Sequence, residues 1–143
     1  MNQKHVPSLE LCEELDRLCK EKGIVVPATE FYWYLSPEGW VIVDRQYKET
    51  STGRLICPPA PLVSELGEWL PTTLELTTPP QPFPKTEQTI LMFSRYLSDK
   101  NWEAVYVGVK SENVYIERQG QTEANARQMM LNFLIAEGII TTL

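Results

Sequence analysis

Few side chains in this sequence are of the types that carry out nucleophilic or metal chemistry. Histidine occurs once, at His5, and cysteine occurs at Cys12, Cys19 and Cys57. A nucleophile needs a neighbouring base that a third group orients, and a lone histidine so near the N-terminus is badly placed to be that base. The cysteines contain no CxxC pair, so we predict no metal ligands, no cofactor, and reduced thiols of the kind found in the cytoplasm.

Carboxylates are abundant, but their positions do not favour acid–base catalysis. They lie mostly on the polar faces of predicted helices, as at Glu13, Glu14, Glu65 and Glu68, where charged groups usually face solvent. No GxxxxGK[ST] or GxGxxG run is present to bind phosphate groups. We therefore predict no catalytic residue. A site assembled from residues far apart in the sequence stays open as an alternative.

The composition is that of a globular protein that fits one domain, residues 1–143. Of the 143 residues, 43% are apolar and 22% are charged, and the formal net charge is −6. This charge disfavours contact with a phosphate backbone, and no stripe of lysine and arginine compensates for it. No apolar run resembles a signal peptide or a membrane span, so we expect a cytoplasmic protein without a membrane partner.

Two amphipathic helices are predicted near the ends of the chain. The first runs from Ser8 to Gly23, with one apolar and one charged face. The last runs from Thr122 to about Ile140, because Thr122 can cap its first turn and Gly138 can end it. Its apolar stripe is so wide that one thin face must hold the polar residues, which are Arg127, Gln128, Asn132 and Glu137.

The clearest hairpin lies in the first third of the chain. The strands Glu30–Leu35 and Trp40–Tyr47 flank Ser36–Gly39, whose residues match a type I turn. A third strand is expected at Arg54–Cys57. Because both faces of this hairpin are apolar, we expect it at the centre of its sheet.

A second hairpin is predicted from the alternating residues of Trp102–Val109 and Asn113–Arg118. Asn113 suits its turn because asparagine tolerates the left-handed conformation. Strands that come in hairpins, rather than alternating with helices, predict an α+β fold. We expect a mostly antiparallel sheet of about five strands, in two hairpin or meander groups, packed by the N- and C-terminal helices.

The middle of the chain is rich in proline. A short helix is predicted from Pro61 to Pro71, and a proline-rich loop at about residues 71–85 contains a candidate edge strand at Leu74–Thr77. For Thr86–Ser98 the spacing of apolar residues predicts a helix. The competing interpretation is a strand through Thr89–Phe93, since that apolar run is short and continuous.

Two segments are candidate binding sites. Alternation along the first strand directs Trp33 towards the core and Tyr32 and Tyr34 to the other side of the sheet, beside a cross-strand aromatic such as Trp40. If uncovered, this aromatic face would bind a peptide, a protein or a stacked base; if helices cover it, it is core.

The second candidate is the proline loop. An extended segment there could dock into an aromatic groove of a partner through Pro79, Pro80, Pro82 and Phe83. A variable insertion without a binding role is the alternative.

Four segments together resemble a family of small uncharacterised proteins of phages and prophages. They read PSLELCEEL, FYWYLSPEGWVIVD, APLVSELGEWLP and TEANARQMMLNFLIAEGII. The shared motifs are structural, namely a strand pair, a short helix and a capped terminal helix. The resemblance therefore implies an intracellular accessory protein of phage or prophage origin, and no catalytic residue or cofactor.

The first functional hypothesis is a non-enzymatic accessory protein that acts through contact with another protein or with a second copy of itself. The alternative hypothesis is a role with nucleic acid, either binding a single strand on the aromatic face or mimicking nucleic acid with acidic groups. A further alternative is a small-molecule-binding protein or enzyme whose site the sequence does not reveal.

Overall fold

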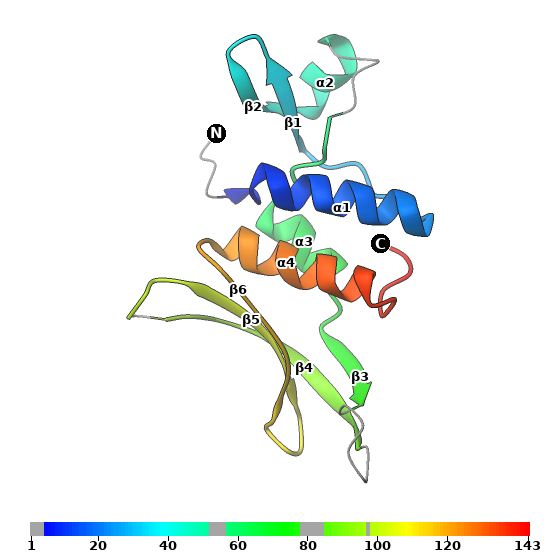
Figure 1. Ribbon diagram of the computed structural model, residues 1–143, viewed down its shortest axis with the longest axis vertical. Coiled ribbons are helices and arrows are strands. Elements are labelled where there is room, and N and C mark those ends of the chain that lie inside the picture. Colours follow the sequence, from blue (N-terminus) through cyan, green and yellow to red (C-terminus); the bar gives the residue numbers. More distant parts are fainter. Residues whose placement is uncertain (1–4, 52–56, 78–84, 97) are drawn as a thin grey trace.

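The computed structural model describes residues 5–51, 57–77, 85–96 and 98–143. In chain order these form α1 (Leu9–Lys22), β1 (Phe31–Ser36), β2 (Gly39–Asp44), α2 (Arg45–Ser51), α3 (Val63–Trp69), β3 (Thr73–Thr77), β4 (Thr86–Arg95), β5 (Trp102–Gly108), β6 (Val114–Gly120) and α4 (Glu123–Ala136). The predicted α+β class is confirmed, with antiparallel strands and with the first and last helices stacked over the larger sheet (Figure 1).

The larger sheet has the strand order β3-β4-β5-β6, and every neighbouring pair is antiparallel. The helix α4 lies across one of its faces, where it contacts β5 and β6. Ala104 and Tyr106 of β5 are fully buried against Met130, Leu131 and other apolar residues of α4. This interface is the main core. The predicted edge strand Leu74–Thr77 and the predicted second hairpin are both confirmed, although the left-handed residue of the hairpin turn is Glu112, with φ 60°, and not Asn113.

The helix α1 packs on α4, so the helices form a layer on one side of the larger sheet (Figure 1). Thr122 caps α4 as predicted, because its Oγ1 accepts a hydrogen bond of 3.1 Å from the N–H of Asn125. The predicted polar face of α4 is only partly exposed. Gln128 and Asn132 are buried and bonded to each other, and Asn132 donates to the carbonyl oxygen of Leu11 on α1. Helix periodicity places these polar residues on one face, but it cannot show that a second helix lies against that face.

The hairpin of β1 and β2 is not central in a sheet, contrary to the prediction. It forms a two-stranded sheet of its own on the far side of α1 from the larger sheet (Figure 1). Its second strand ends at Asp44 rather than Tyr47, since Asp44 caps a helix: its carboxylate accepts a bond of 2.7 Å from the N–H of Tyr47. Both faces carry apolar residues because Trp33 on one face packs with Cys12 of α1, and α2 contacts the other face.

The predicted third strand, Arg54–Cys57, falls mostly outside the described residues, and Cys57 is not in a strand. The next residues contact β1 instead. Pro59 forms an isolated bridge with Tyr32, and the Trp33 N–H donates to the carbonyl oxygen of Pro58 at 2.9 Å. This short contact covers the edge of β1 that β2 leaves open.

The predicted helix at Thr86–Ser98 is wrong, and the competing strand interpretation is correct. The strand β4 pairs with both β3 and β5, so it is a central strand. Leu91 and Phe93 pack towards the core, whereas Ile90 and Met92 point to the opposite face. A strand with apolar side chains on both faces lacks the alternation that would distinguish it from a helix.

Candidate functional site

The predicted aromatic face is divided between the two sides of the hairpin. The register pairs Leu35 with Trp40 and Tyr34 with Val41, so Trp40 shares a face with Leu35 and Trp33. The tyrosines lie on the other face, and the expectation that Trp40 stands beside them is wrong. An antiparallel pair places directly opposite residues on one side, which fixes this arrangement once the turn is known.

The tyrosine face is covered by α2. Tyr32 is buried, and the Lys48 Nζ lies 4.3 Å from the centre of its ring. The rings of Tyr34 and Tyr47 meet edge to face, with 5.7 Å between their centroids. Tyr32 is therefore part of the folded core of the hairpin unit rather than an open platform, and Tyr34 is half-buried beside it.

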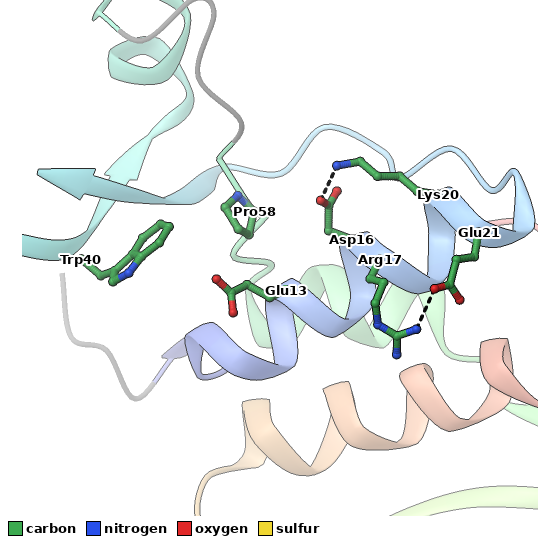
Figure 2. A pocket seen from close by; sticks show the side chains of 7 residues that line it. All are labelled: Glu13, Asp16, Arg17, Lys20, Glu21, Trp40 and Pro58. Atoms are coloured by element: carbon green, nitrogen blue, oxygen red, sulfur yellow. Dashed lines mark hydrogen bonds and ion pairs between the residues drawn. The ribbon is translucent and has the colours of Figure 1, made fainter.

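Trp40 is exposed at the tip of the hairpin, where it faces a shallow groove above α1 (Figure 2). The groove has a volume of about 420 Å³ and is lined by Glu13, Asp16, Arg17, Lys20, Glu21, Trp40 and Pro58. Four of these charges already pair along the helix, Lys20 with Asp16 at 2.6 Å and Arg17 with Glu21 at 2.9 Å. Exposed ion pairs of this spacing are usual on helix surfaces. These four side chains therefore neutralise one another and do not by themselves indicate a ligand site.

The proline-loop candidates Pro79, Pro80, Pro82 and Phe83 all lie outside the described residues. The hypothesis that they bind a partner stays a prediction.

The densest polar cluster lies around Glu87, at the turn between β5 and β6. Its carboxylate accepts four hydrogen bonds: from the N–H groups of Lys110 and Ser111, from the Ser111 hydroxyl and from the Tyr115 hydroxyl. The Ser111 and Tyr115 bonds and the Lys110 N–H lower the pKa of Glu87 to about 2. Gly108 provides the space for this carboxylate, because a Cβ there would lie 2.4 Å from Glu87 Oε2.

The Glu87 cluster is built to hold a turn rather than to catalyse a reaction. A general base works best when its pKa lies near the operating pH, and a carboxylate with a pKa near 2 is a weak base. The Ser111 hydroxyl donates to this carboxylate and has no imidazole beside it, so nothing activates it as a nucleophile. Among the described residues, no group of three or more His, Cys, Asp and Glu side chains is arranged to hold a metal ion.

The most extensive unexplained surface is the side of the larger sheet that faces away from the helices. We call it the outer sheet face, and its apolar residues are Ile90, Met92, Val105, Val107, Val109 and Val114. All four helices lie on the other side of this sheet (Figure 1). Ile90 is 41% exposed, Met92 52%, Val109 58% and Val114 56%. Ile90 and Met92 belong to β4, Val109 directly follows β5, and Val114 begins β6. Exposed apolar residues gathered on one face are typical of an interaction site.

The register shows how these side chains meet. Ile90 of β4 lies opposite Val107 of β5, and Val107 lies opposite Val114 of β6. One step along the sheet, Met92 lies opposite Val105. The outer sheet face therefore has two apolar rows that run across adjacent strands, one of Ile90, Val107 and Val114 and one of Met92 and Val105. Val105, in one of the two central strands, is buried.

Acidic residues lie around the outer sheet face. Glu75 is on β3, Glu103 is near the start of β5, and Glu117 of β6 lies opposite Val105. At the outward positions of these four strands the described residues include no lysine or arginine. The face is thus an apolar centre with a negative margin.

An apolar cleft of about 570 Å³ lies where α4 ends, between the edge strands β3 and β6, and it shares Val114 with the outer sheet face. Its lining residues are Leu76, Thr77, Asn113, Val114, Tyr115, Ile116, Phe133, Glu137 and Ile139. A volume of this size is within the range of small-molecule sites. The Arg118 guanidinium covers the Phe133 ring at 3.9 Å from its centroid.

The sequence prediction placed the binding surface on the first hairpin and missed the outer sheet face. Val105, Val107 and Val109 alternate in the sequence and signal a strand with one apolar face. The other apolar row, Ile90 and Met92, was assigned to a helix, so the two were not combined. No helix among the described residues has the length and apolar character of a membrane span.

Comparison of the chain with protein-family models, with curated proteins and with solved structures finds no match.

Proposed function

We propose that this protein is a non-enzymatic accessory protein that acts by contact with another protein through the outer sheet face. The observation that supports this proposal is the group of exposed apolar side chains on that face, Ile90, Met92, Val109 and Val114, with no described helix on that side of the sheet. Burial of such side chains by a partner removes apolar surface from water, which is the main driving force of protein association. The Glu87 cluster supports a binding rather than a catalytic role, because its chemistry is used within the turn.

The size of the face indicates a modest affinity. Four strands about 4.8 Å apart and about five residues long give a face of roughly 300 Å². Only part of this area is apolar, so at about 25 cal/mol per Å² its burial contributes less than roughly 7 kcal/mol, which does not exceed the free energy lost on association. The contact is therefore transient unless the partner extends beyond the sheet.

Site-specific photocrosslinking tests the proposal. A photoreactive amino acid replaces Met92 on the outer sheet face in one variant and Leu35 on the first hairpin in the other. The two side chains are a matched pair, since Met92 is 52% and Leu35 57% exposed. We expect a discrete crosslinked species from position 92 and none from position 35, in cells that naturally produce the protein. No product from position 92, or the same product from both positions, would contradict the proposal.

The proposed setting is the cytoplasm, in a phage or prophage context. The resemblance of the four sequence segments to phage-associated proteins supports it, as does the odd number of unclustered cysteines, of which Cys12 and Cys19 are buried and free. The genes that neighbour this one test the setting, and we expect phage structural or regulatory genes among them.

A second candidate function is the binding of a small hydrophobic molecule in the cleft between β3, β6 and the end of α4. The apolar walls formed by Leu76, Ile116 and Phe133 favour it. A Thr77→Trp variant fills the cleft. We expect a hydrophobic dye to bind the wild-type protein and the Met92→Ala variant but not the Thr77→Trp variant. Equal binding of the dye by both variants would exclude the cleft as the binding site.

A further inference from the structure

We propose that the partner of the outer sheet face is a protein surface that is apolar at its centre and has lysine or arginine side chains at its margin. This inference rests on the proposed function and adds the chemistry of the partner. It also excludes a second copy of this chain as the main occupant.

The first argument is that the acidic residues of the outer sheet face have no positively charged partner within the described part of the chain. Glu75 and Glu117 are exposed, whereas Glu103 is largely buried, with 8% of its surface exposed. Their described hydrogen-bond partners are uncharged: the Ser94 hydroxyl reaches Glu103 at 3.4 Å, and the Gln119 amide reaches Glu117 at 2.7 Å. No described lysine or arginine forms an ion pair with any of the three carboxylates.

Some acids of the helical layer are paired: Asp16 and Glu21 on α1 and Glu123 on α4 each pair with a cation one turn away. Glu13 on α1 and Glu68 on α3 form no such ion pair with any described residue. What distinguishes the outer sheet face is that its negative charge lies around exposed apolar side chains. A partner with cations at the matching margin would neutralise it, whereas a partner with anions there would be repelled.

The second argument concerns self-association. A symmetric dimer through the outer sheet face would bring two copies of Glu75, Glu103 and Glu117 around one small apolar contact. Like charges around such a contact oppose association.

The test uses two synthetic amphipathic peptides with identical leucine positions, one with lysine and one with glutamate on the polar face. Their binding is measured by fluorescence anisotropy with the full chain. The face variant is Glu75→Gln, Glu103→Gln and Glu117→Gln together. The control variant is Glu13→Gln, Glu38→Gln and Glu68→Gln, which are exposed glutamates outside the outer sheet face. Each variant removes three negative charges from a net charge of −6, so net charge alone affects both equally.

We expect the lysine peptide to bind the wild-type protein and the glutamate peptide not to bind. The face variant should weaken binding of the lysine peptide roughly tenfold, as expected for the loss of the charge pairs of the exposed Glu75 and Glu117 together with that of the largely buried Glu103. The control variant should change it less than about twofold. A third variant, Met92→Ser, should also weaken it, because the apolar centre takes part.

Equal weakening by the face and control variants overturns the inference, since net charge then explains the binding. So does a lysine peptide that fails to bind, or a concentration-dependent mass of twice 16.4 kDa that Met92→Ser abolishes. In each of these cases a crosslink from position 92 would still support the proposed function. Absence of that crosslink removes the proposed function itself, so the two failures are distinguishable.

Discussion

Glu87 and Ser111 are 24 residues apart and are joined by two hydrogen bonds of 2.6 Å, one from the Ser111 N–H and one from its hydroxyl. These bonds attach the start of β4 to the turn between β5 and β6. Tyr115 adds a bond of 2.8 Å from its hydroxyl to the same carboxylate. One ionised side chain thus links three segments at the end of the larger sheet.

This cluster predicts a pH-dependent stability. The folded state lowers the pKa of Glu87 from 4.5 to about 2. A depressed pKa means that the ionised form is favoured in the folded state, so its contribution is fully present above pH 4.5 and is lost as the pH falls towards 2. Urea unfolding of the wild-type protein and of Glu87→Gln should therefore differ most near neutral pH. A difference between them that is constant from pH 7 to pH 2 would contradict the prediction.

Asn132 should be costly to truncate. Its amide nitrogen donates to the Leu11 carbonyl and to Glu14, and its oxygen accepts from the buried amide of Gln128 at 2.7 Å. Asn132→Ala leaves that buried donor without a partner, and we expect a loss of about 2–3 kcal/mol in the free energy of unfolding.

The matched control for Asn132→Ala replaces both Gln128 and Asn132 with leucine. It removes the whole polar pair, including the Gln128 Oε1, which has no partner among the described residues. We expect the double variant to lose less stability than Asn132→Ala, because replacing both partners leaves fewer unsatisfied groups. A double variant that is less stable than the single one would show that shape, not hydrogen bonding, dominates at this site.

The two aromatic residues assigned to one face by the sequence should respond differently to truncation. Tyr32 is 7% exposed and Trp40 37% exposed. We expect Tyr32→Ala to lower the free energy of unfolding by about 3 kcal/mol, and Trp40→Ala by less than about 1.5 kcal/mol. Chemical denaturation measures both, and equal losses would mean that the hairpin tip is packed more tightly than its exposure indicates.

Two methionines test whether the outer sheet face contributes to the stability of the folded chain. Met130 of α4 is fully buried and Met92 is 52% exposed. We expect Met130→Ala to cost about 2–5 kcal/mol and Met92→Ala to change stability by no more than about 0.5 kcal/mol. A large loss for Met92→Ala would indicate that the folded chain itself uses this side chain.

Elements that are specified by a few neighbouring residues could be predicted well from the sequence. Thr122 caps α4, and Gly23 and Gly138 have positive φ angles of 67° and 72° after α1 and α4. Each of these depends on a few neighbouring residues, because a cap or a left-handed residue is selected by the backbone of one turn. The turn Ser36–Gly39 is predictable for the same reason.

The position of β4 and the candidate surface could not be predicted in this way. Ile90 and Met92 form part of the outer sheet face only because β4 pairs with β5, and that pairing joins residues more than ten positions apart. The burial of Gln128 and Asn132 could not be predicted either, since it depends on α1, where the Leu11 carbonyl accepts a hydrogen bond from Asn132. In both cases the partner that decides the environment is remote in the sequence.

The sequence by itself determined the α+β class, the hairpins, and the two capped terminal helices, since hydrophobic periodicity and turn chemistry act over a few residues. Only the tertiary structure decided that the first hairpin forms its own small sheet, that α2 covers Tyr32, and that the opposite end of the molecule leaves Ile90 and Met92 exposed. Which apolar face becomes core depends on which element packs over it, and that choice is made by contacts across the whole chain.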